Sequence, residues 1–133
     1  MKIAIVTNDG LTVSQHFGRA RFYLVVEMDG DKEVDRELRR RFTPHLSGNA
    51  GHGEAHAPGQ PHGTGPEAMR RHAAMAEAIK DCQFLIAGGM GTGAVQAMEA
   101  SGIKVILTDL TEINRVIEAF ADGTLQDRRE RMD

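Results

Sequence analysis

One stretch of this chain has the residue types of an anion-binding turn. Residues 88–93 hold four glycines and follow the apolar run Phe84–Ala87, and apolar residues then recur at helical spacing. A strand, a glycine turn and a helix start together present backbone N–H groups that have no partner inside the helix, and the helix dipole favours negative charge there. The sequence therefore predicts a ligand-binding turn made of Gly89, Met90, Gly91, Thr92 and Gly93.

Two other interpretations of these glycines stay open. The glycines can simply form a tight turn. The spacing of Gly89, Gly91 and Ala94, with Asp109 further on, also fits a relaxed dinucleotide-binding fingerprint. That fingerprint normally opens its domain, whereas this one lies in the middle of the chain.

Histidines are the second chemical signal. His16 lies in the run His16-Phe17-Gly18-Arg19, and the stretch from residue 44 to 65 is rich in Gly, Ala and Pro. Neutral imidazole is a good ligand for zinc, nickel, copper or iron. The predicted metal-ligating residues are therefore His16, His45, His52, His56 and His62. Because residues 44–65 offer almost nothing apolar to bury, we expect a flexible loop. Its histidines either collect a metal or have no specific role.

The single cysteine, Cys82, excludes an internal disulfide framework and suits a reducing cytoplasm. It precedes the strand at Phe84, at the opposite end from the glycine turn, so we expect a small buried residue rather than part of the same site.

Composition narrows the function classes further. The chain has 133 residues, a net charge of −3 and 41% hydrophobic residues without Trp. These values favour one aliphatic-core domain and give no electrostatic case for general nucleic-acid binding. No apolar run is long enough to span a membrane, and the start of the chain does not resemble a secretory signal.

The order of patterns predicts an α/β fold. Five strands are expected from short β-branched or apolar runs, and Asp29-Gly30 marks a hairpin between the second and third. The predicted strands are Lys2–Thr7, Phe22–Met28, Glu33–Phe42, Phe84–Ala87 and Lys104–Thr108. Right-handed parallel crossovers then give a mixed five-stranded sheet of order 3-2-1-4-5, with helices on both faces, as in ribonuclease H-like folds.

Three helices complete the predicted domain. The first starts at a capping box, Thr64 to Glu67, and buries the stripe Met69, His72, Ala73, Ala76 and Ile79, with His72 as a packing residue. The second buries Ala94, Val95 and Met98. Thr111 caps the third, whose stripe is Ile113, Val116, Ile117 and Phe120, and Gly123 ends it. The domain is expected to span 1–124, followed by a charged tail, 125–133, that frays or forms a short helix.

Strand direction brings several loops to one edge of the sheet, the rim at the carboxyl ends of the parallel strands. The His16 loop, the glycine turn, the His-rich loop and Asp109 all follow strands that end there. Open α/β sheets bind ligands at this edge. We add Asn8, at the end of the first strand, to the cofactor-binding residues. Asp9 and Asp109 could also meet at the rim and bind magnesium, although fold alone does not support that role.

The third strand carries the run Arg39–Arg41. Its arginines either contact phosphate or belong to a charge-guarded, solvated edge strand, and we favour the solvated edge.

Three segments together resemble a known family, the dinitrogenase iron–molybdenum cofactor biosynthesis family, which includes NifX-like proteins and the C-terminal domain of NifB. They are residues 1–10, residues 14–20 (Ser-Gln-His-Phe-Gly-Arg-Ala) and residues 80–93 (Lys-Asp-Cys-Gln-Phe-Leu-Ile-Ala-Gly-Gly-Met-Gly-Thr-Gly), and the likeness reaches from Met1 to about Leu125. It implies a ribonuclease H-like fold and binding of iron–molybdenum cofactor or its iron–sulfur precursors. The radical-enzyme domain of NifB is absent from this sequence.

These observations lead to one preferred function and two alternatives. We expect a cytoplasmic, non-catalytic carrier of an iron–sulfur or iron–molybdenum cluster, monomeric or weakly dimeric, whose partners are cluster-assembly or cluster-accepting proteins. Four cysteine ligands are impossible with Cys82 alone, so the cluster would rest on the glycine-turn amides with His16 as a ligand. The alternatives are a divalent-metal binder using the His-rich loop and a nucleotide-binding module.

Overall fold

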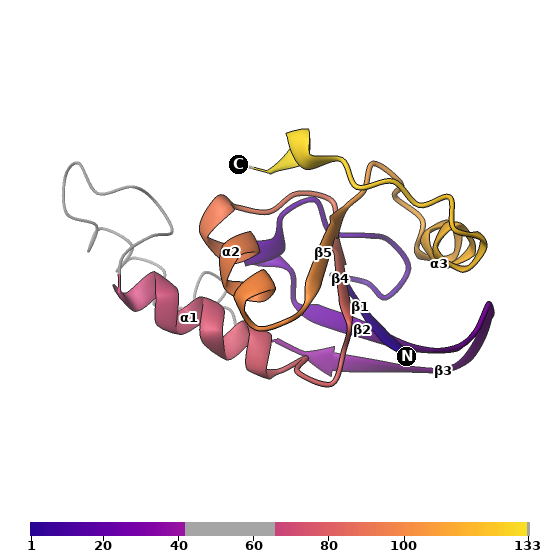
Figure 1. Ribbon diagram of the computed structural model, residues 1–133, viewed down its shortest axis with the longest axis horizontal. Coiled ribbons are helices and arrows are strands. Elements are labelled where there is room, and N and C mark those ends of the chain that lie inside the picture. The colour runs from indigo at the N-terminus through magenta and orange to yellow at the C-terminus, as the bar shows by residue number, and fades with distance from the viewer. Residues whose placement is uncertain (42–65, 133) are drawn as a thin grey trace.

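The computed structural model describes residues 1–41 and 66–132. Their elements follow the predicted order (Figure 1). In chain order they are β1 (Lys2–Thr7), the 3-10 helix η1 (Phe17–Arg19), β2 (Phe22–Asp29), β3 (Lys32–Arg40), α1 (Pro66–Glu77), β4 (Phe84–Ala87), α2 (Thr92–Ala100), β5 (Lys104–Leu107), α3 (Ile113–Asp122) and the 3-10 helix η4 (Arg129–Arg131).

The sheet has the predicted order, β3-β2-β1-β4-β5. β1 pairs antiparallel with β2 and parallel with β4, and β5 extends the sheet in parallel beyond β4. Gly30, at the hairpin between β2 and β3, has a φ of 62°, which glycine adopts without strain. The mixed five-stranded α/β architecture is therefore confirmed.

Alternate residues of the strands pack on opposite faces of the sheet. Ala4 and Val6 of β1 join the core beneath α1 and α2, whereas Ile3 and Ile5 join the core beneath α3. Figure 1 shows α1 and α2 on one side of the sheet and α3 on the other. The predicted arrangement of helices on both faces is thus correct.

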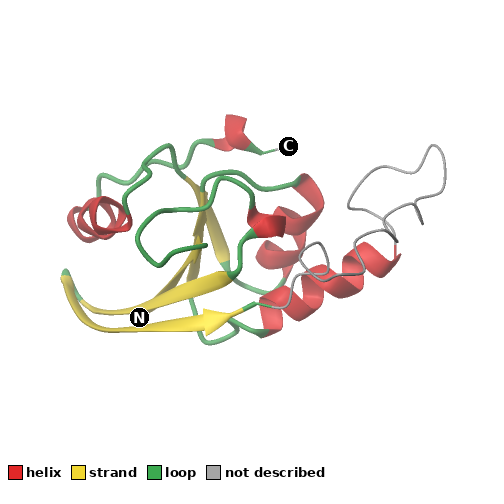
Figure 2. Ribbon diagram, turned by 180° about the vertical axis from the view of Figure 1, so that it is seen from behind, coloured by secondary structure: helices red, strands yellow, loops and turns green. Residues whose placement is uncertain are grey.

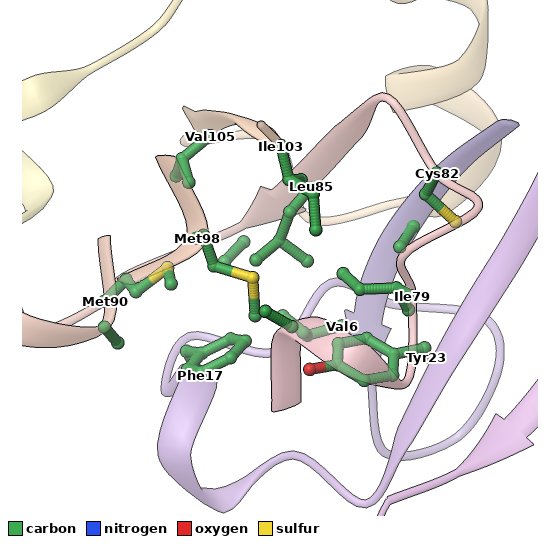
Figure 3. Close-up of a cluster of buried hydrophobic side chains, with 14 of the residues drawn as sticks. Val6, Phe17, Tyr23, Ile79, Cys82, Leu85, Met90, Met98, Ile103 and Val105 are labelled. Carbon is green, nitrogen blue, oxygen red and sulfur yellow. The ribbon is translucent and has the colours of Figure 1, made fainter. Parts of the chain in front are cut away.

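The core beneath α1 and α2 is mainly aliphatic and also contains aromatic and sulfur-containing side chains (Figure 3). Met98 of α2 lies in its middle, and Phe17 and Met90 lie at one end. Cys82 lies at the other end and is buried, as expected. The Cys82 thiol therefore lies at the opposite end of this core from Met90, a residue of the glycine turn (Figure 3).

Two predictions about the helices need correction. Met69 of α1 is 64% exposed and Ala73 is exposed, whereas Ala68, Ala76 and Ile79 are buried. The N-terminal part of α1 extends past the sheet (Figures 1 and 2), so Met69 does not reach the core beneath the helix. The predicted capping residue Thr64 lies outside the described residues. His72 is half-buried, as predicted.

Thr111 does not cap α3. The N-cap is Glu112, without a side-chain hydrogen bond. The backbone carbonyl of Thr111 accepts a hydrogen bond from Val13 N at 2.8 Å, and Thr12 bridges Glu112, so this segment is used to anchor the loop after β1. At the other end, Gly123 has a φ of 79° and ends α3 as predicted.

The edge strand β3 is exposed along most of its length, as predicted. Arg39 pairs with Asp81 and Glu37 at this edge. The prediction of a solvated run is wrong for Arg41, which is only 7% exposed. Arg41 follows the last residue of β3, and there its side chain turns under the loop that contains Phe17.

Candidate functional site

The His16 loop and the glycine turn are joined by backbone hydrogen bonds. Gly88 N donates to Ser14 O at 2.9 Å, and Phe17 N donates to Gly89 O at 3.1 Å. In Figures 1 and 2, η1 lies beside α2. The predicted juxtaposition of this loop with the turn at the rim therefore exists in the backbone.

Protein atoms occupy the space beside the first two glycines of the turn. A Cβ atom on Gly89 would lie 2.6 Å from the carbonyl oxygen of Gln15, and one on Gly88 would lie 2.5 Å from Gln15 Nε2. By contrast, a Cβ on Gly91 meets nothing within 4 Å. The close approach that a dinucleotide fingerprint reserves for pyrophosphate is taken at Gly89 by the chain's own backbone.

The helix start that follows has the features expected of an anion-binding end. Gly91 is the N-cap of α2, and as a glycine it makes no side-chain capping hydrogen bond. Thr92 and Gly93 lie in the first turn, where N–H groups have no intrahelical acceptor. Met90 is 1% exposed and packs in the core, so it offers a ligand little surface.

His16 is exposed at the N-cap of η1. Its backbone N–H donates to Ser14 Oγ, and its carbonyl accepts from the same hydroxyl, both at 3.2 Å. The neighbouring residues Gln15 and Phe17 both contact the glycine turn. The backbone around His16 is thus fixed next to the turn while the side chain stays exposed.

The other polar residues predicted at the rim have structural partners. Asn8 Oδ1 accepts a hydrogen bond from Arg21 N at 3.0 Å. Asp9 accepts from the amides of Leu11 and Thr12, which lower the pKa of its carboxyl to about 2. Asp109 pairs with Arg128 at 3.3 Å. Each carboxylate proposed for magnesium is therefore engaged by other groups.

The C-terminal segment contacts the glycine turn and the His16 loop, and the sequence did not predict this contact. Arg131 Nε donates to Gly88 O at 2.6 Å, and Arg131 Nη2 donates to Gln15 Oε1 at 2.7 Å. Met132 forms a bridge with Met90. In Figure 1 this segment runs across the top of the view, over the end of β5. The charged tail forms the predicted short helix but is anchored rather than frayed.

Cys82 lies away from the glycine turn, as predicted. Burial raises the pKa of the Cys82 thiol to about 12, so it supplies little thiolate. His45, His52, His56 and His62 lie outside the described residues. Within residues 1–41 and 66–132, no group of three His, Cys, Asp or Glu side chains is arranged to hold a metal ion. No helix in the same ranges is long and apolar enough to cross a membrane.

Comparisons with known proteins identify relatives along the whole domain. The family model described as "Dinitrogenase iron-molybdenum cofactor" matches residues 1–123. No curated protein matches the chain.

Solved structures resemble the chain over most of its length. The crystal structure of PH0822 shares 26% identity at a TM-score of 0.64, with 96% of this chain and 94% of that one covered. The apo form of the orange protein of Desulfovibrio gigas shares 26% identity at a TM-score of 0.59, with 96% of this chain and 92% of that one covered. The MJ0327 protein of Methanocaldococcus jannaschii shares 12% identity at a TM-score of 0.63, with 96% of this chain and 94% of that one covered. At this identity the likeness shows the fold alone.

Proposed function

Because the chain belongs to the dinitrogenase iron–molybdenum cofactor family, we propose that it binds an iron–sulfur or iron–molybdenum cluster as cargo and stores it or delivers it to partner proteins. In this role it is non-catalytic, and its partners are proteins that assemble or accept the cluster. A structural relative is described as an apo form, the term for a protein without its ligand.

The observation that carries this proposal is the junction between the His16 loop and the start of α2. The bond from Phe17 N to Gly89 O joins the loop that carries the exposed His16 to the turn before α2, and the N-cap of α2 is a glycine without a side-chain capping bond. An anionic cluster fits such a place, since the first-turn amides favour negative charge and imidazole is a good ligand for iron.

Ligand number supports a carrier rather than a permanent cluster protein. The chain has one cysteine, and that thiol is buried with a raised pKa. A resident cluster normally uses several thiolates. A preassembled cluster held by one imidazole and backbone amides has few protein bonds to break, which suits release to an acceptor.

The test is an anaerobic titration with a cluster precursor, followed by visible absorption. His16→Ala should weaken binding by roughly tenfold or more, the loss expected from one metal–ligand or charge-assisted contact. Lys104→Ala is the control, because Lys104 is exposed at the start of β5, at the opposite end of that strand from the rim. Unchanged binding in His16→Ala would remove the proposed site.

The same titration separates the divalent-metal alternative. Deleting residues 44–63 with His16 intact removes His45, His52, His56 and His62. Loss of binding in that variant alone would assign the metal to the His-rich loop. Calorimetry with adenine and nicotinamide nucleotides tests the nucleotide-binding alternative.

Three finer assignments belong to the same proposal. They are a cytoplasmic location, a monomer or weak homodimer, and a ribonuclease H-like classification of the sheet.

A further inference from the structure

A second candidate site lies away from the glycine turn, between α1 and the ends of β2 and β3. A cavity of about 390 Å³ is present there. Arg40, Arg41, Arg70 and Arg71 line it, together with the apolar surfaces of Tyr23 and Met75. The volume is in the range of small-molecule pockets.

Arg41 is the buried member of this set. It is 7% exposed, and its guanidinium lies 4.3 Å from the ring centre of Phe17 and 4.6 Å from that of Tyr23. Its Nη1 donates to the carbonyl oxygens of Phe17 and Ala20. Its Nε and Nη2 have no hydrogen-bond partner in the part of the chain that the structure describes.

These four arginines differ from Arg39 in their charge partners. Within residues 1–41 and 66–132, none of the four forms an ion pair, whereas their neighbour Arg39 pairs with Asp81 at 2.7 Å. A buried charge is costly unless it is paired, and four like charges around one cavity add repulsion. An anion in the cavity would relieve both costs.

Arginine also narrows the chemistry of the anion. Its planar guanidinium presents parallel N–H donors that match phosphate oxygens in pairs, and it is more weakly hydrated than an ammonium group. The Tyr23 hydroxyl already donates to Met75 O at 3.1 Å, so its ring serves as apolar surface. The cavity thus combines a strongly cationic wall with an apolar one.

We propose that this cavity binds a small organic phosphate. The phosphate group is held by Arg40, Arg70 and Arg71 beside the buried charge of Arg41, and the apolar body lies against Tyr23 and Met75. The cavity is distinct from the proposed cluster site, because its lining includes neither His16 nor the glycine turn, although Arg41 contacts Phe17 of the His16 loop.

The experiment is calorimetry on the full chain at low ionic strength with phenyl phosphate, inorganic phosphate, benzoate and phenol. Arg70→Gln and Arg71→Gln are the test variants, since both residues are on α1 and neither is fully buried. Arg115→Gln on α3, across the sheet, removes the same charge and is the matched control. A thermal shift with each ligand gives a second measurement.

Phenyl phosphate should bind more tightly than inorganic phosphate, and phenol should not bind. Each test variant should weaken phenyl phosphate binding by roughly tenfold, and the control should not. Equal weakening in Arg115→Gln, or benzoate binding as tightly as phenyl phosphate, would overturn the assignment. So would the absence of both heat and thermal shift at millimolar phenyl phosphate. His16→Ala should leave the affinity unchanged, which keeps this test separate from the cluster titration.

Discussion

Replacing Gly89 with alanine tests whether the glycine turn is held against the His16 loop as described. The added Cβ would lie 2.6 Å from the backbone carbonyl oxygen of Gln15, closer than packed atoms approach. Gly89 does not have a positive φ, so the backbone can accept alanine and the cost is steric. The loop must move, and this movement weakens the bond from Phe17 N to Gly89 O.

The size of this effect follows from two terms. Overpacking costs about 1–3 kcal/mol, and weakening one buried hydrogen bond adds roughly 1 kcal/mol. Gly89→Ala should therefore lower the free energy of unfolding by about 2–4 kcal/mol. For a chain of this size that is a fall in melting temperature of roughly 6–20 °C.

Two neighbouring glycines provide a graded control in the same urea-unfolding assay. Gly88→Ala meets only the side chain of Gln15, which can move, so its cost should be smaller. At Gly91 the Cβ enters open space. There alanine lowers the conformational entropy of the unfolded chain, and this stabilisation roughly offsets the poorer N-cap. The free energy of unfolding should change by less than about 1 kcal/mol. Equal losses at Gly89 and Gly91 would refute the packing described here.

Three further predictions concern other parts of the fold. Arg131→Met should cost about 1–2 kcal/mol and speed amide exchange across residues 128–132, because the hydrogen bonds to Gly88 O and to Gln15 Oε1 are lost; unchanged exchange would contradict the docking. Asp9 has a lowered pKa of about 2, so its contribution is complete above pH 4 and lost as the pH falls toward 2. In Asp9→Ala the free energy of unfolding should therefore depend less on pH in this range. The difference from the parent chain should be less than about 2 kcal/mol, because Asp9 is exposed. Cys82, with a pKa of about 12, should react slowly with iodoacetamide at pH 8 until urea unfolds the chain, and fast native labelling would contradict its burial.

Sheet topology could be predicted because it depends on short-range patterns. The Asp29-Gly30 turn fixes the antiparallel pair, and the strand–helix–strand order from Phe84 to Leu107 leaves one handedness for the parallel crossovers. Direction then follows for every strand, and with it the set of loops at the rim. The neighbourhood of His16 and the glycine turn was predicted by this reasoning rather than by any single motif.

Contacts between segments far apart in the chain could not be predicted. Arg131 bonds to Gln15, 116 residues away, and to the carbonyl of Gly88. A run of charges at a chain end is the usual pattern of a solvated tail. Every residue has a backbone carbonyl, so the sequence does not indicate which one accepts the bond from Arg131. The prediction that Thr111 caps α3 was wrong for a related reason, since the Thr111 carbonyl accepts a hydrogen bond from Val13 N.

Arg41 illustrates how one residue can depart from its neighbours. Three successive arginines share one sequence signal, but only the third lies beyond the end of β3. There its side chain meets the carbonyls of Phe17 and Ala20 and the rings of Phe17 and Tyr23. These partners decide its burial, and none is adjacent in sequence.

The hydrogen bonds of the turn also limit where a ligand can bind. Gly88 uses both its N–H and its carbonyl on Ser14 and Arg131, and the Gly89 carbonyl is used by Phe17. A cluster at the rim would therefore have to use N–H groups other than that of Gly88, such as those at the start of α2, where a Cβ on Gly91 would also meet open space. Because such amides favour any anion, selectivity must come from side chains, and His16 is the exposed candidate that the turn holds in position. Gly88 and Gly89 thus position the His16 loop against the turn, and the proposed ligand chemistry falls to that loop.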